Sequence, residues 1–237
     1  MAELGIDSMI VKEFKIEDLK LHYFIGINQI EIDIRKILEV NNITDQKELP
    51  DLIFSKIETL QNNFSNVIIQ ITNNKYILNQ DHIFTAGYYL QKAFLQNLNI
   101  SNKRNIEFIL YLSANRQISK GFEAFGITDI DLKKHNLITC IISPINNIGE
   151  INRKILLSLN AYEIDITIND QSIEKFNRIK EFYEISENQI ASVLKSYGIY
   201  KINEEHLYNN LNAKFLAVHD LLCEKMALLN IERAKIS

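Results

Sequence analysis

Two short, mostly apolar runs constrain the fold of this 237-residue chain more than any other feature. They are Val67-Ile68-Ile69-Gln70-Ile71 and Leu137-Ile138-Thr139-Cys140-Ile141-Ile142. Asparagine borders the first run and Pro144 follows the second, and short β-branched segments bounded in this way predict buried strands. Segments with helical periodicity lie between and around them, and neither a Ser-, Gly- or Pro-rich linker nor a repeat interrupts the chain. We therefore predict an α+β fold in a single domain.

The spacing of apolar residues extends this prediction along the chain. Strands are expected at residues 21–27 and 162–168, and residues 76–78 are expected to pair back on the first run as a hairpin. Helices are expected at residues 29–40, from Pro50 onward, at 83–98, 118–125, 151–159 and 173–182, from Ser186 onward, and from about residue 204. Residues 106–112 are apolar and fit either a strand or a helix. We expect residues 1–19 to be a leader and residues 20–237 to form the domain.

Composition favours a folded protein outside the membrane. Apolar residues make up 46% of the chain and charged residues 24%, a balance that supplies a sizeable core and argues against global disorder. No stretch approaches the roughly 18 consecutive apolar residues of a membrane span. The first residues lack the basic region and apolar run of a signal peptide, so we expect a cytoplasmic protein. Cys140 and Cys223 lie in apolar runs and are expected to be reduced core thiols.

No pattern of catalytic residues is present in the sequence. The chain lacks a glycine-rich phosphate loop, a nucleophile elbow around serine, and a zinc-binding pair of histidines on one helix turn. Its five histidines are scattered, so we expect no metal and no cofactor. Glu163 and Asp165 would share one face of the expected strand. They could form a functional carboxylate pair, but we favour the interpretation that this face of the strand is simply solvated.

Basic residues gather around a polar turn between residues 106–112 and 118–125. They are Lys92, Lys103, Arg104, Arg116, Lys120, Lys133 and Lys134. Arginine suits phosphate, and the neighbouring Tyr88 and Tyr111 could stack on bases. This density of charge is close to background, however, so an ordinary scaffold remains an alternative. The net charge of −4 argues against a protein that coats nucleic acid indiscriminately.

Three stretches resemble the kinase-binding subunit of the KEOPS complex, an archaeal and eukaryotic family that includes the human p53-related-kinase-binding protein. The first is Tyr111-Leu112-Ser113-Ala114-Asn115-Arg116-Gln117-Ile118, followed by Ala124-Phe125-Gly126-Ile127. The second is Asn79-Gln80-Asp81-His82-Ile83, followed by Tyr89-Leu90-Gln91-Lys92-Ala93. The third, residues 220–231, is similar to the family's closing motif, with Lys225 in place of arginine and Asn230 in place of aspartate. The resemblance covers residues 20–143 and 174–231, favours an archaeal member, and leaves an insertion around residues 145–172.

The resemblance implies a fold and a function. KEOPS makes the threonylcarbamoyl modification of the adenosine beside the tRNA anticodon. A member of this family is a non-catalytic subunit that docks on the small atypical kinase/ATPase subunit and, in archaea, recruits tRNA by its single-stranded 3' CCA tail. The family fold is an antiparallel-rich central sheet flanked by helices, with a helix at residues 106–112. Unpaired bases are bound by stacking, edge contacts and a few phosphate charges, which an acidic protein can supply.

Two sets of site residues follow from the resemblance and the pattern together. The expected RNA-binding residues are Tyr88, Lys92, Arg104, Arg116, Gln117 and Lys120. The expected kinase-docking residues are Leu222, Met226, Leu228 and Leu229. The alternatives are that Arg116 only caps or pairs at a helix end, that the C-terminal leucines belong to a core helix, and that the protein is an adaptor with no RNA contact. A small-molecule enzyme is the remaining class.

Overall fold

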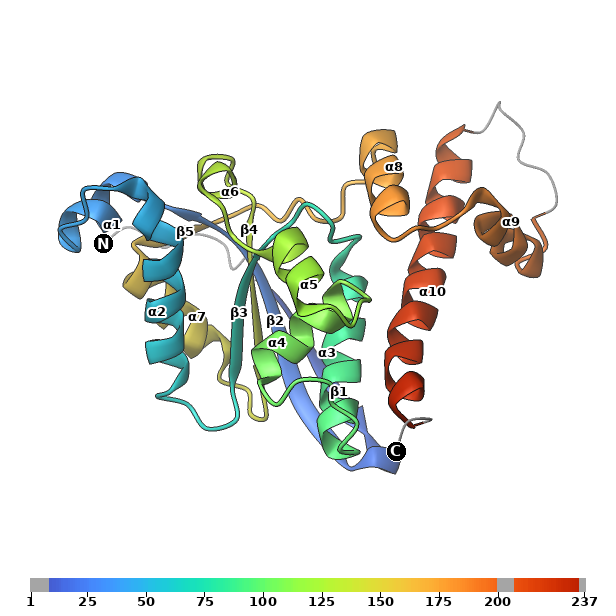
Figure 1. Ribbon diagram of the computed structural model, residues 1–237, viewed down its shortest axis with the longest axis horizontal. Helices are drawn as coiled ribbons and strands as arrows, with labels where there is room; N and C mark the ends of the chain where they lie inside the picture. The colour runs from blue at the N-terminus through green and yellow to red at the C-terminus, as the bar shows by residue number, and fades with distance from the viewer. Residues whose placement is uncertain (1–8, 200–206, 235–237) are drawn as a thin grey trace. The chain divides into compact units, whose positions relative to one another are not determined.

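The structure of the chain is a computed structural model that describes residues 9–199 and 207–234 (Figure 1). Backbone contacts divide the chain into two compact units. Unit 1 contains the residues up to Lys75 together with Phe125–Thr167, and unit 2 contains Tyr76–Ala124 and the residues from Ile168 onward. Because the chain passes from one unit to the other three times, neither unit is a separate sequence segment. This interleaving explains why no linker is visible in the sequence, and the expected α+β class is confirmed.

Within the described residues, unit 1 holds a five-stranded sheet in which every pairing is antiparallel. Its strands are β1 (Ile10–Ile16), β2 (Leu21–Ile32), β3 (Ile68–Asn73), β4 (Leu137–Ser143) and β5 (Ala161–Ile164). Four of them follow the order β1-β2-β4-β3. The fifth, β5, pairs with the second half of β2, along the edge whose first half pairs with β1. The expected antiparallel-rich sheet is therefore present, and both apolar runs are strands.

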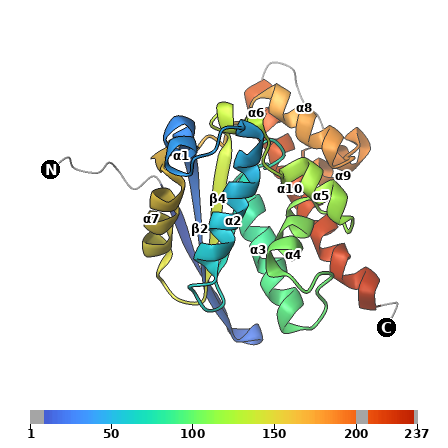
Figure 2. The same ribbon diagram turned by 60° about the vertical axis from the view of Figure 1, so that its left-hand side comes forward.

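Helices cover one face of this sheet. They are α1 (Ile34–Val40), α2 (Leu49–Gln61), α6 (Asp129–Lys133) and α7 (Ile148–Leu159), and two short 3-10 turns, η1 (Glu17–Leu19) and η2 (Gln46–Glu48), join neighbouring elements. Figure 2 shows α1, α2 and α7 alongside β2 and β4. Alternate strand residues such as Ile30, Ile69 and Ile141 belong to the same buried cluster as Ile53 of α2 and Ile155 of α7. The period of two along each strand therefore builds one layer of the core.

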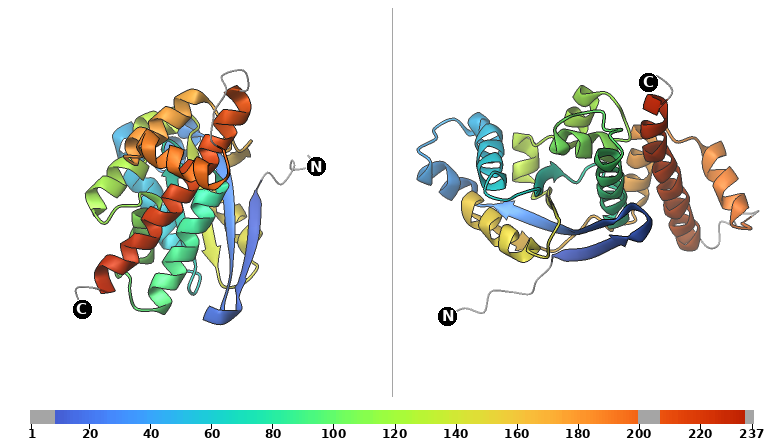
Figure 3. Two further views of the ribbon diagram at one scale, coloured as in Figure 1. Left: turned by 90° about the vertical axis from the view of Figure 1, so that its right-hand side faces the viewer. Right: turned by 90° about the horizontal axis from the view of Figure 1, so that it is seen from below.

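Unit 2 is helical. Its helices are α3 (Gln80–Leu95), α4 (Arg104–Leu112), α5 (Ile118–Phe125), α8 (Ile173–Phe182), α9 (Glu187–Ser196) and α10 (Leu207–Ala234). The long helix α10 packs against α3, α4, α8 and α9, and Figure 3 shows it running beside α3. Side chains cap two of these helices: Asn79 accepts a hydrogen bond from the His82 N–H at 2.9 Å, and Ser186, where a helix start is expected, forms a capping box with Gln189. No helix in the described ranges is both long enough and apolar enough to cross a membrane.

Several local expectations were wrong. Residues 10–16, assigned to a leader, form the edge strand β1. Residues 29–32 belong to β2 rather than to a helix, because β4 and β5 pair with them; the helix starts only after Asp33, whose side chain accepts a hydrogen bond from the Lys36 N–H at 3.0 Å. Residues 76–78 form no hairpin strand, and β5 ends at Ile164 instead of extending to residue 168. The expected helix start near residue 204 lies outside the described residues.

Candidate partner and RNA interface

The polar turn between α4 and α5 is shaped by its own hydrogen bonds. Ala114 N–H donates to the Tyr111 carbonyl at 3.0 Å, and Asn115 N–H donates to the Leu110 carbonyl at 3.1 Å. This pair of bonds ends a helix when the residue that donates the first of them is left-handed, and Ala114 has a φ of 46°. Asn115 Oδ1 then accepts from the Gln117 N–H at 2.8 Å. The turn therefore has a defined shape and presents an exposed Gln117 side chain.

Two buried side chains anchor the end of α4 that precedes this turn. His82 Nε2 lies 3.0 Å from the Leu112 carbonyl oxygen, and the Tyr183 hydroxyl donates to the same oxygen at 2.7 Å. His82 Nδ1 accepts from the Leu78 N–H at 3.2 Å, so the proton of the neutral ring sits on Nε2. Burial lowers the pKa of His82 to about 3, which keeps the ring neutral. The sequence analysis assigned neither residue a role; the only signal was the position of His82 just inside a capped helix.

The expected RNA-binding residues lie on α3, at the start of α4 and beyond the end of α4. Tyr88 and Lys92 lie on α3, and Arg104 is the first residue of α4. Lys92 Nζ lies 5.9 Å from the centre of the Tyr88 ring, which is within cation–π range. The Arg104 guanidinium lies 4.4 Å from the centre of the Phe94 ring and donates to Gln91 Oε1 at 3.1 Å. Both contacts are with α3, so this arginine is largely committed to packing there, and burial lowers the pKa of Arg104.

Arg116, Gln117 and Lys120 lie beyond the other end of α4, whose axis from Arg104 to Leu112 is about 12 Å long. Arg116 Nη1 donates a hydrogen bond to the Leu229 carbonyl at 2.8 Å, which ties the turn to α10. Gln117 and Lys120 are exposed. The contact of Arg116 therefore agrees with the alternative that this arginine pairs within the protein. The exposed polar side chains beyond this end of α4 are Gln117 and Lys120.

The expected kinase-docking residues divide into a buried set and an exposed one. Leu222 and Met226 are fully buried and Leu229 is 6% exposed, so these three side chains face the core of unit 2. They fit the alternative of an ordinary core helix. Leu228 is 45% exposed and lies on the outer face of α10. Two further apolar side chains that the sequence analysis did not assign to an interface, Ile118 and Phe122 on α5, are 44% and 42% exposed.

Chemical groups elsewhere in the chain are arranged for packing. The Glu163 carboxylate accepts hydrogen bonds from the Asn28 and Asn152 amides, so it belongs to a partly buried network and not to a solvated face. Cys223 Sγ lies 3.8 to 3.9 Å from both ring nitrogens of His219, and burial raises the pKa of the thiol. In the described part of the chain, no three His, Cys, Asp or Glu side chains come together as a metal site would require.

Comparison with known proteins places the chain in a family. No curated protein matches the chain. The model of the family described as kinase binding protein CGI-121 matches residues 40–230, which include the anchored turn and most of α10. This match covers far more than half of the sequence, and it agrees with the resemblance carried by the turn and by the C-terminal motif. The chain belongs to the kinase binding protein CGI-121 family.

Proposed function

We propose that this protein is a non-catalytic subunit of a KEOPS complex that docks on the small atypical kinase/ATPase subunit and recruits tRNA by its 3' CCA tail. The observation that carries the proposal is the family match over residues 40–230. The proposed role is to bring the tRNA to a modification reaction catalysed by another subunit, which makes threonylcarbamoyladenosine in the cytoplasm. Such a role needs surfaces for a protein and for an RNA strand and requires no catalytic group of its own.

Groups on α3 and beyond the end of α4 support the RNA part of the proposal. On α3, Lys92 and the Tyr88 ring offer a cation beside a surface for stacking. Beyond the end of α4, the anchored turn presents the Gln117 amide and the Lys120 ammonium to solvent. A single strand laid along α4 would meet a few charges, one aromatic face and one amide that can bond to base edges. The His82 and Tyr183 bonds to Leu112 hold that turn in place.

A second candidate function is a protein-only adaptor of the kinase. It is favoured by the state of the two arginines: Arg104 packs on Phe94 and bonds to Gln91, and Arg116 bonds to the Leu229 carbonyl. These contacts leave lysines as the most accessible cations near the turn. A net charge of −4 points the same way.

Two binding measurements test the proposal. The first is titration of the protein with the cognate kinase subunit, where excess partner should also raise the melting temperature by mass action. The second compares full-length tRNA with tRNA that lacks its CCA end. The tRNA-recruiting role predicts loss of binding when the CCA end is removed, and weaker binding by Lys120→Glu but not by Lys36→Glu, an exposed control on α1.

Kinase binding without any tRNA binding would establish the protein-only adaptor. Equal binding of both tRNA forms would contradict recruitment through the tail. Absence of kinase binding would contradict both candidate functions.

A further inference from the structure

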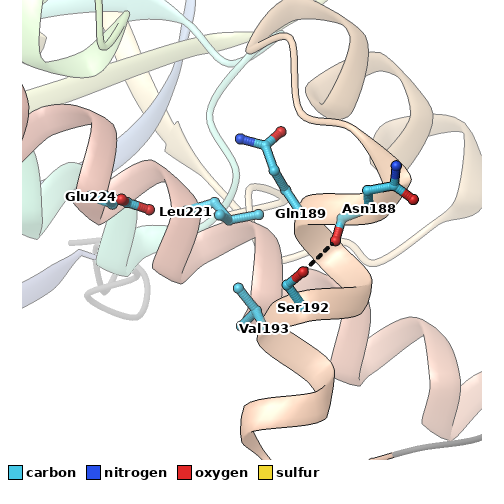
Figure 4. Close-up of a pocket in the computed structure, with 6 residues that line it drawn as sticks. All are labelled: Asn188, Gln189, Ser192, Val193, Leu221 and Glu224. Carbon is cyan, nitrogen blue, oxygen red and sulfur yellow. Dashed lines mark hydrogen bonds between the residues drawn. The ribbon is translucent and has the colours of Figure 1, made fainter.

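A groove lies between α9 and α10, beside the exposed Glu224 of α10. Its volume is ≈ 420 Å³, and it is lined by Asn188, Gln189, Ser192, Val193, Leu221 and Glu224. Figure 4 shows the four α9 residues and the two α10 residues around it. All six belong to unit 2, so the groove is formed within one compact unit.

The groove has an apolar part and a polar rim with a single charge. Val193 and the nearly buried Leu221 supply apolar surface. The polar groups of α9 are partly occupied: Ser192 Oγ donates to the Asn188 carbonyl at 2.8 Å, and Gln189 Oε1 accepts from Ser186 in the capping box. The exposed Glu224 carboxylate makes no ion pair or side-chain hydrogen bond within the described residues. Its charge is therefore available to a binding partner.

Glu224 is part of a longer exposed row on α10. Leu216, Asp220, Glu224 and Leu228 recur every fourth residue over about 18 Å of the helix, and each is turned by about 40° from the one before, so neighbouring members of the row share a face. Leu216 is 54% exposed and Leu228 is 45% exposed, while Asp220 accepts a hydrogen bond from the Tyr197 hydroxyl at the end of α9. Two carboxylates thus lie between two exposed leucines.

This chemistry selects one class of partner. A carboxylate without a cation among the lining residues repels phosphate, so RNA does not fit the groove. An open hollow with a mostly polar rim also fits a small apolar ligand poorly. A lysine or arginine side chain fits, because its methylenes can lie on Val193 and Leu221 while its charged end reaches Glu224.

We propose that the α9–α10 groove receives a lysine or arginine side chain of the partner kinase, and that Leu228 packs against an apolar side chain of the same docking segment. The proposal rests on the kinase-docking function proposed above and adds the surface and the chemistry of the contact. It keeps Leu228 among the expected docking residues, replaces the buried Leu222, Met226 and Leu229, and adds Glu224 and the lining residues of α9.

The test is the dissociation constant for the cognate kinase subunit, measured by calorimetry with the full chain. Glu224→Lys reverses the charge in the groove and should weaken binding at least about tenfold, because it opposes a cation at a buried contact. Ser192→Arg fills the groove with a cation of the chain itself and should weaken binding similarly. Glu58→Lys, the same charge change at an exposed position of α2, is the matched control and should leave the affinity unchanged. Melting curves check that each variant is folded.

Salt dependence gives an independent readout. The affinity of the native chain should fall as ionic strength rises, and Glu224→Gln should show a smaller fall, since it removes the screened charge pair. Unchanged kinase binding by both Glu224→Lys and Ser192→Arg would overturn the groove contact while leaving kinase docking intact. Absence of kinase binding by the native chain would overturn docking itself and the groove contact with it. Tighter binding of tRNA by Glu224→Lys, with kinase affinity unchanged, would assign the surface to RNA instead.

Discussion

Arg116 Nη1 donates a hydrogen bond to the backbone carbonyl of Leu229, with the two atoms 2.8 Å apart. The bond connects the α4–α5 turn, where RNA contacts were expected, to the helix where kinase docking was expected. Both residues lie in unit 2. A change at Arg116 therefore alters the packing of α10 as well as the charge beside the turn, and an RNA-binding defect of such a variant needs a stability measurement beside it.

Arg116→Ala should lower the free energy of unfolding by about 1–2 kcal/mol, because it removes a charge-assisted bond to a partly buried carbonyl. Chemical denaturation of the full chain measures this loss. Lys120→Ala is the control: it removes an exposed cation a few residues away and should change stability by no more than about 0.5 kcal/mol. Equal stability of Arg116→Ala and the native chain would mean that the bond to Leu229 contributes nothing.

Ala114→Gly should stabilise the protein by up to about 1 kcal/mol. Ala114 has a φ of 46°, where a Cβ atom is unfavourable and glycine is not. Ala114→Val is the matched opposite, because a β-branched residue tolerates this backbone conformation least. Unfolding midpoints of the three proteins should follow the order Gly, Ala, Val. A destabilised glycine variant would show that entropy lost on folding outweighs the relief of strain.

Local chemistry in the sequence was sufficient to locate most of the helices and strands. The capping side chains of Asn79 and Ser186 act within three residues of themselves, and the β-branched runs of β3 and β4 are buried along their whole length. The prediction of a helix at residues 29–32 was wrong because Ile30, Ile34 and Ile37 have helical spacing. Pairing with strands more than one hundred residues away decides their conformation, and no local pattern carries that information.

The candidate site was predictable in position and less so in the role of each side chain. The turn lies where the sequence predicted it. The sequence shows that an arginine is positively charged but does not show which groups it contacts. Phe94 and Leu229, which engage Arg104 and Arg116, come from other helices. On α10, adjacent residues point about 100° apart, so one residue decides whether a leucine is buried or exposed. That is why Leu228 and Leu229 face different ways.

Glu107→Gln should destabilise the protein by about 1–3 kcal/mol, because a buried charged acceptor is replaced by a neutral one. The Glu107 side chain is fully buried and accepts hydrogen bonds from the Ile100 and Ser101 N–H groups at 2.7 to 3.0 Å, which holds the segment that leads into α4. Urea unfolding measures the loss. Glu123→Gln, at an exposed position of α5, should be within about 0.5 kcal/mol of the native chain. A similar loss in both variants would contradict a specific role for the buried carboxylate.

Stability should fall with acidity because of His82. Its pKa in the folded chain is about 3, below the ordinary 6.5, so between these values the unfolded chain binds a proton that the folded chain excludes. The stabilisation that comes from a neutral His82 is complete above the ordinary pKa. It is lost as the pH falls, and the free energy of unfolding then decreases by about 1.4 kcal/mol per pH unit. Between about pH 7 and pH 5 the free energy of unfolding should therefore drop by about 2 kcal/mol from this residue alone.

The variant His82→Gln removes the contribution of His82 to the pH dependence of stability. The variant should be less stable at about pH 7, where it lacks the bonds of the ring to Leu78 and Leu112, and its stability should fall less steeply toward about pH 5. Denaturation at several pH values measures both slopes. Identical slopes for the native chain and His82→Gln would mean that the folded protein accepts a proton on His82, and hence that the contact between Nδ1 and the Leu78 N–H gives way in acid.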